Sequence, residues 1–153
     1  AGGGPRDDSQ VTVSPASLRA FAGAVRLPYF GLPPDKLIEL VGRMTARQFD
    51  ENRLVVRQGD AGDSMFVIRR GAVRVIRREP DGRETTLVTL REGDCFGEMS
   101  LLTGQARNAS VVTLRECEIL ELRRSDLDDF MARHPRFAAS LRAYAERRKN
   151  SES

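Results

Sequence analysis

The chain has 153 residues, which is the ordinary size of one domain and is enough to bury a single core. Hydrophobic residues make up 40% and charged residues 31%, a mixture that excludes wholesale disorder and a fibrous protein. The net charge of +3 is spread along the chain, so support for a nucleic-acid partner is weak and we expect none.

The cysteines and the hydropathy pattern indicate the compartment. Cys95 and Cys117 match no metal-binding spacing, and a chain of this size needs no disulfide, so a reduced, cytoplasmic setting is expected. No apolar run approaches the roughly 20 residues that span a bilayer, and no signal-peptide pattern opens the chain. We therefore expect a soluble piece, either a protein of its own or the cytoplasmic part of a membrane protein.

The N-terminal part predicts a short frayed end followed by helices. Residues 1–10 are glycine-rich and polar, which is typical of a flexible terminus, and the segment 11–46 is expected to be helical. Ser14 followed by Pro15 indicates an N-cap and a proline at the first helical position, with the helix reaching about Arg26. Pro33-Pro34-Asp35 opens a second helix with apolar residues at helical spacing.

The segment 47–123 predicts the β-structure. Its hydrophobic period changes to two, and glycine-containing turns divide it into short runs. This pattern indicates antiparallel strands at residues 47–50, 53–57, 64–70, 72–78, 84–91, 107–113 and 117–123.

The segment 124–149 returns to a helical pattern. Ser125 and the acidic residues after it resemble a capping box, and Pro135 separates this helix from a final one that reaches about Arg148. The order of helices, strands and helices predicts an α+β fold. At its centre we expect an antiparallel β-roll, a jelly-roll-like barrel, flanked by N-terminal helices and C-terminal lid helices.

The segment 96–111 interrupts the strand pattern and carries the chemistry. Gly97 and Glu98 begin a short helical turn, where backbone N–H groups without an internal partner can receive a phosphate. Arg107 opens the next strand and can add a charge-assisted contact worth roughly 1.5 to 3 kcal/mol. The Glu98 carboxylate suits a sugar hydroxyl. A ligand that offers a ribose and one phosphate charge within a few ångströms is a cyclic nucleotide.

This segment resembles the phosphate-binding cassette of cyclic-nucleotide-binding domains. That family includes protein kinase regulatory subunits, gated channels and bacterial cyclic AMP receptors. The resemblance covers roughly Pro28 to Arg148 and includes the turn Gln58-Gly59-Asp60, the turn at Gly71, and Glu92-Gly93-Asp94. It implies a β-roll flanked by helices, in agreement with the order of elements predicted above.

The resemblance also implies roles for individual residues. Glu98 would bind the ribose 2′-hydroxyl, and Arg107 the exocyclic phosphate oxygens. Further contacts are expected from the backbone or walls at Gly97, Met99, Asn108 and Ala109, an apolar floor beneath the base from Val75 and Val88, and a contact to the base from Arg148 on the closing last helix.

Asn108 bears on the choice of ligand. Guanine-preferring members usually carry threonine or serine directly after the arginine, so Asn108 favours cyclic AMP over cyclic GMP, although an asparagine amide can also bond a guanine. No other cofactor is expected.

Two other classes of protein receive little support. A metal-dependent enzyme on a jelly roll needs several histidines and a carboxylate, whereas this chain has one histidine, His134. No nucleophile and base are paired for hydrolysis, so an enzyme is not expected. A transcription factor of the cyclic AMP receptor type needs a helix-turn-helix after the roll, and we expect none because the sequence ends soon after residue 149.

We therefore expect a regulatory domain that transmits ligand occupancy through its C-terminal helices to a covalently attached effector. The expected parent is a bacterial cyclic-nucleotide-gated potassium channel, and the isolated domain is expected to be monomeric. The alternatives left open are a soluble regulator of the cyclic AMP receptor type, another multidomain protein, and a β-roll scaffold that binds no nucleotide.

Overall fold

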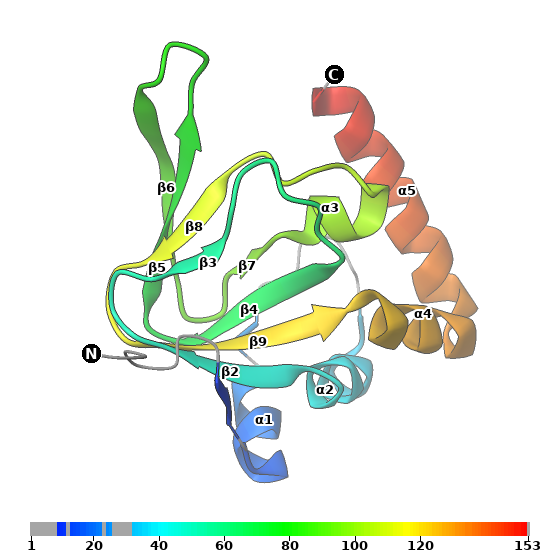
Figure 1. The fold of residues 1–153 in the computed structure, drawn as a ribbon. Helices are drawn as coiled ribbons and strands as arrows, with labels where there is room; N and C mark the ends of the chain where they lie inside the picture. Colours follow the sequence, from blue (N-terminus) through cyan, green and yellow to red (C-terminus); the bar gives the residue numbers. More distant parts are fainter. Residues whose placement is uncertain (1–8, 12, 23, 26–31, 153) are drawn as a thin grey trace.

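The computed structural model describes residues 9–11, 13–22, 24–25 and 32–152. These residues form two antiparallel sheets that face each other, with helices packed at one end and along one side (Figure 1). The predicted α+β fold with a central β-roll is confirmed. The described strands stay in two separate sheets and do not close into a barrel.

Each sheet contains strands from both the early and the late part of the chain. The larger sheet has the order β1 (Ser9–Val11), β2 (Thr45–Phe49), β9 (Cys117–Arg123), β4 (Ser64–Arg70) and β7 (Cys95–Phe96). The smaller sheet has the order β3 (Leu54–Val56), β8 (Ser110–Thr113), β5 (Ala72–Arg78) and β6 (Glu84–Arg91). The ranges of β4, β5, β6 and β9 are those predicted from the period of two.

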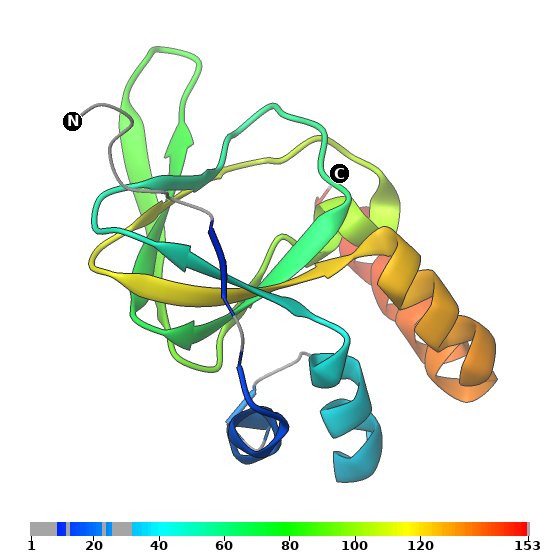
Figure 2. The same ribbon diagram turned by 60° about the horizontal axis from the view of Figure 1, so that its bottom comes forward.

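Five helices accompany the sheets in the described part of the chain. They are α1 (Pro15–Ala22), α2 (Pro34–Gly42), α3 (Glu98–Thr103), α4 (Arg124–Arg133) and α5 (Pro135–Glu152). Figure 2 shows α1 and α2 together beside β1 and β2, and α4 and α5 packed against each other. The pair α4 and α5 lies next to α2, since Arg43 directly after α2 donates to Asp129 of α4. Ser14 caps α1 as predicted, since its Oγ accepts the Ser17 N–H at 3.1 Å.

Several predicted boundaries differ from the structure. β1 pairs with β2 and lies where a frayed end and then a helix were expected. The sequence did not predict this strand, because three residues are too few to show a period of two. α4 begins at Arg124 without a side-chain cap, so the capping box predicted at Ser125 is wrong. The predicted end of the first helix at Arg26, like residues 1–8, lies outside the described residues.

The core consists of two clusters on opposite faces of the larger sheet. One lies inside the roll, between the sheets, and includes Phe66, Ile68 and Ile119. The other packs the helices against the sheet's second face and includes Leu120, Phe130 and Tyr144. No helix in the described ranges combines the length and the apolar character needed to cross a membrane.

Candidate functional site

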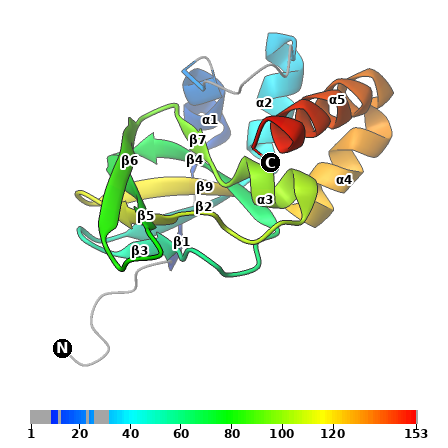
Figure 3. The ribbon, with the colours of Figure 1, turned by 90° about the horizontal axis from the view of Figure 1, so that it is seen from above.

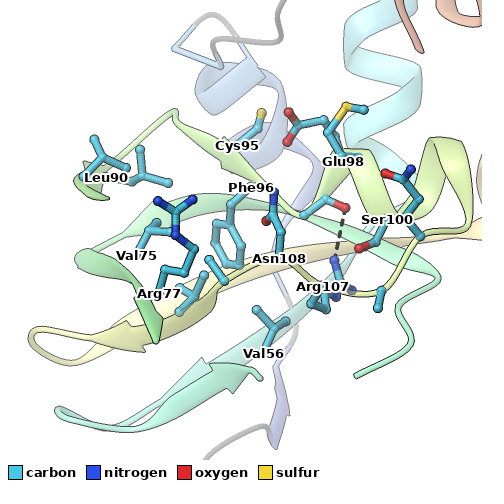
Figure 4. Close-up of a pocket in the computed structure, with 17 residues that line it drawn as sticks. Val56, Val75, Arg77, Leu90, Cys95, Phe96, Glu98, Ser100, Arg107 and Asn108 are labelled. Carbon is cyan, nitrogen blue, oxygen red and sulfur yellow. Dashed lines mark hydrogen bonds between the residues drawn. The ribbon is translucent and has the colours of Figure 1, made fainter. Parts of the chain in front are cut away.

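A pocket of about 870 Å³ lies where the smaller sheet meets the segment between β7 and β8 (Figure 4). β7 leads through Gly97 into α3, and a loop then returns to β8. The lining residues are Val56, Val75, Arg77, Val88, Leu90, Cys95, Phe96, Gly97, Glu98, Met99, Ser100, Gln105, Ala106, Arg107, Asn108, Ala109 and Val111.

Eight of the nine predicted site residues meet around this pocket. They are Val75, Val88, Gly97, Glu98, Met99, Arg107, Asn108 and Ala109. The ninth, Arg148, lies on α5, and its side chain falls outside the described residues. The structure thus places Val75 and Val88 beside the predicted cassette, from which they are distant in the sequence. The contacts of each residue with a ligand remain predictions.

Arg107 is held firmly in the wall of the pocket. Only 8% of the residue is exposed. Its Nη1 donates to the carbonyl of Gly97 at 3.1 Å, and its Nη2 donates to the carbonyl of Ser64 at 3.0 Å. The guanidinium carbon also lies 5.7 Å from the centre of the Phe66 ring, a cation–π distance. These contacts fix the side chain in the pocket wall.

The surroundings of Arg107 combine burial with negative charge. Burial lowers the pKa of the guanidinium, and the nearby carboxylates of Asp63 and Glu121 oppose that effect. An arginine stays protonated under such conditions. The pocket wall therefore carries a cation that is largely removed from water, where its interaction with an anion is less screened.

The backbone near Arg107 is pinned to the loop between β3 and β4. The Arg107 N–H donates to the carbonyl of Asp60 at 2.8 Å, and the Gly59 N–H donates to the carbonyl of Arg107 at 2.7 Å. These bonds use backbone groups that a strand would use, so β8 begins at Ser110 and not at the predicted Arg107. The Gly59-Asp60 turn thus fixes the position of the Arg107 backbone, from which the side chain extends into the pocket wall.

Gly97 allows the close approach between α3 and Arg107. Its φ of +82° is in the left-handed region that favours glycine. A Cβ atom at this position would come within 2.6 Å of the Nη1 atom of Arg107. Any side chain here would displace the guanidinium, so the glycine is needed for the observed geometry.

Some lining residues were not among the predicted site residues. Arg77 follows Val75 by two positions on β5, so the period of two in the sequence already places both side chains on one face. Val56 and Val111 come from two further strands of the smaller sheet, β3 and β8, which are neighbours in it. No local motif marks them, because strand pairing brings them to the pocket. In the described part of the chain, no group of three metal-ligating side chains is found.

Known proteins resemble this chain in sequence and in fold. The family described as cyclic nucleotide-binding domain matches residues 46–134. The cyclic AMP receptor protein of Thermus thermophilus is 34% identical over 120 residues, which are 78% of this chain and 56% of that protein. A cyclic nucleotide-gated potassium channel of Mesorhizobium japonicum is 31% identical over 78% of this chain and 32% of the channel.

A solved structure adds the comparison of folds. The N-terminal domain of a transcriptional regulator from Streptomyces coelicolor has a TM-score of 0.74 and 30% identity, covering 84% of this chain and 92% of that one. The chain spans about half the length of the Thermus receptor protein. Because the family match covers more than half of the chain and includes the whole segment that lines the pocket, this protein belongs to the cyclic nucleotide-binding domain family.

Proposed function

We propose that the chain is a sensor that binds cyclic AMP in preference to cyclic GMP in the pocket at α3. The observation that carries the proposal is the composition of that pocket. A buried arginine, Arg107, and the partly buried carboxylate residue Glu98 line it together with the valines of β5 and β6. A cyclic nucleotide offers an anion, a sugar hydroxyl and a flat base to these three kinds of surface.

The phosphate is assigned to Arg107. A guanidinium carries five N–H groups, and the bonds to Gly97 and Ser64 use two of them. A phosphate can therefore accept from this side chain while the bonds that position it remain. Glu98 at the start of α3 is assigned to the ribose 2′-hydroxyl, because a carboxylate accepts from a hydroxyl and would repel the phosphate.

The base is assigned to the floor formed by Val75 and Val88. These two residues are direct partners in the pairing of β5 and β6, and both line the pocket. Asn108 is exposed at the pocket edge, and in place of threonine or serine it favours adenine. Arg148 is assigned to the base from the side of α5.

Occupancy is proposed to reach the C-terminal helices through α3. This helix contributes to the pocket with Glu98 and packs against α5, which lies beside it (Figure 3). Leu101 of α3 is in one buried cluster with Leu141 and Tyr144 of α5 and with Phe130 of α4. A ligand that contacts α3 differently in two states shifts the equilibrium between two packings of these helices.

The attached effector is proposed to be a bacterial cyclic-nucleotide-gated channel, which makes this chain its cytoplasmic domain. The support is the 31% identity to the Mesorhizobium channel. A second candidate is a regulator of transcription, favoured by the 34% identity to the Thermus receptor protein, and DNA would then be a partner of the parent protein. Neither proposal includes a catalytic step. Apolar spans of about 20 residues encoded before Ala1 would support the channel, and a DNA-binding segment encoded after Ser153 would support the regulator.

Calorimetric titration with cyclic AMP and cyclic GMP tests the nucleotide site. We expect the chain to bind cyclic AMP more tightly and the Arg107→Ala variant to lose at least about tenfold in affinity. Arg83→Ala is the control, because the Arg83 side chain is 80% exposed in the β5–β6 turn and is absent from the pocket. Failure of both nucleotides to bind would leave the β-roll as an interaction scaffold.

A further inference from the structure

A partly buried carboxylate, that of Glu121, lies near the arginine of the pocket. Glu121 on β9 accepts a hydrogen bond from the Ser64 hydroxyl at 2.6 Å through Oε2, and one from Arg47 Nε at 2.5 Å through Oε1. Its side chain is 14% exposed. Glu121 does not line the pocket and lies outside the cassette segment 96–111.

Ser64 joins this carboxylate to Arg107. The residue is 5% exposed and begins β4. Its carbonyl accepts from Nη2 of Arg107, while its hydroxyl donates to Glu121. Both bonds depend on the position of one residue, so a displacement of the Ser64 side chain also disturbs the carbonyl that holds the guanidinium.

The charges favour the same arrangement. Burial would raise the pKa of Glu121, but the hydrogen bonds from Ser64 and Arg47 outweigh it and hold that pKa below its ordinary value. Glu121 is therefore a carboxylate at neutral pH. Its negative charge favours the protonated form of the buried Arg107 guanidinium.

The simpler interpretation is that Arg47 and Glu121 form an ion pair that only connects β2 to β9. The same strand carries a matched case for comparison. Glu118 is also 14% exposed, and it also accepts from a partly buried arginine, Arg69, at 2.5 Å. Glu118 is three residues from Glu121, so it points to the opposite face of the sheet and does not contact Ser64 or Arg107.

We propose that Glu121 is a positioning residue of the nucleotide site, which acts through Ser64 to hold Arg107 in the orientation that receives the phosphate. This inference rests on the proposed nucleotide binding. It predicts that Glu121, although outside the pocket, sets the affinity of the pocket, whereas Glu118 contributes only to stability.

Glu121→Gln and Glu118→Gln test the inference as a matched pair. Each variant keeps the size of the side chain and removes the charge. We expect Glu121→Gln to weaken cyclic AMP binding by about three- to tenfold, a typical coupling between residues in one hydrogen-bond network, and Glu118→Gln to leave the affinity within about twofold. Thermal unfolding by circular dichroism checks that both variants fold, and Ser64→Ala provides a second variant with the expected loss of affinity.

A spectrum of the protein without ligand supplies the second readout. In a ¹H–¹⁵N NMR spectrum, Glu121→Gln should shift the amide resonances of Gly97 and Glu98, because the Gly97 carbonyl is bonded to Arg107. Glu118→Gln should leave them in place. A purely structural ion pair would give similar small effects for both glutamates.

The outcomes separate this inference from the proposed function. One outcome is that the unchanged chain binds cyclic AMP, that Arg107→Ala loses this binding, and that the two glutamate variants bind equally well. In that case the positioning role of Glu121 is wrong, and the proposed nucleotide site stands. If the unchanged chain binds neither nucleotide, both proposals fall.

Discussion

The backbone of Gly62 lies directly against the guanidinium of Arg107. A Cβ atom built on Gly62 would overlap the Nε and Cζ atoms of that side chain. The backbone of Gly62 needs no left-handed φ, so the requirement for glycine at this position is the space that the arginine occupies.

Gly62→Ala is therefore expected to displace Arg107. Nucleotide affinity should fall by at least about tenfold, and the free energy of unfolding should fall by about 1–3 kcal/mol because of the overpacking. Titration calorimetry and urea denaturation measure the two effects. Gly42→Ala is the control, since a Cβ atom there meets nothing within 4 Å. A Gly62→Ala variant with unchanged affinity would contradict the importance of the observed Arg107 position.

Val88 and Leu87 offer a matched pair on β6. Their exposed fractions are similar, 46% and 42%, but only Val88 lines the pocket, whereas Leu87 lies at the register shift between the pairs Val75–Val88 and Ile76–Thr86. Val88→Ala should weaken cyclic AMP binding by about two- to fivefold through lost apolar contact. Leu87→Ala should have no such effect. Equal titration curves for the two variants would rule out Val88 as part of the floor.

Acid is expected to weaken the contact between α2 and the junction of α4 and α5. The His134 ring lies 3.2 Å from the Glu39 carboxylate, and this hydrogen bond holds the pKa of Glu39 below its ordinary value of 4.5. A carboxyl group with a lowered folded-state pKa stabilises the protein above its unfolded-state pKa, and that contribution is lost as the pH falls through the folded-state value.

Urea denaturation of Glu39→Gln between pH 6 and pH 3 measures this contribution. The variant should be less stable than the unchanged chain at pH 6, and the two should converge toward pH 3. His134→Gln removes the partner, so Glu39→Gln should have a smaller effect in that background. A stability difference that is constant with pH would show that the pair contributes nothing through its charge.

Phe130 is expected to be essential for the packing of the C-terminal helices. It is fully buried, and its ring lies 4.4 Å from that of His134 and 5.2 Å from that of Phe137, measured between ring centres. Phe130→Ala should lower the free energy of unfolding by about 3–5 kcal/mol. The partly buried neighbour Met131 provides the control, because Met131→Ala removes less buried surface. Similar losses in the free energy of unfolding for both variants would mean that the aromatic contacts of Phe130 add no more stability than the contacts of Met131.

The sequence predicted the regular strands well because their signal is local. β4, β5, β6 and β9 each have at least seven residues with repeated apolar positions, and their ranges were predicted without error. β1 and β7 have three and two residues, which is too few for a period to appear. Their existence depends on neighbouring strands that offer free backbone groups.

The candidate site divides in the same way. Residues of the cassette could be found because Gly97, Glu98 and Arg107 lie within one segment that interrupts the strand pattern. Gly62, Ser64 and Glu121 could not be found, because their effect on Arg107 arises only when β4 and β9 pair and the β3–β4 loop folds over the guanidinium. A residue that acts from a neighbouring strand leaves no spacing signal in the chain.

The separation of the core into two clusters gives the two faces of the larger sheet different neighbours. The cluster inside the roll supplies the apolar interior beside the pocket, whereas the other cluster anchors the helices on the far face of the same sheet. Leu101 of α3 belongs to this second cluster, although α3 lines the pocket with Glu98. A substitution among the helices can therefore alter the pocket through α3 while the interior of the roll keeps its packing.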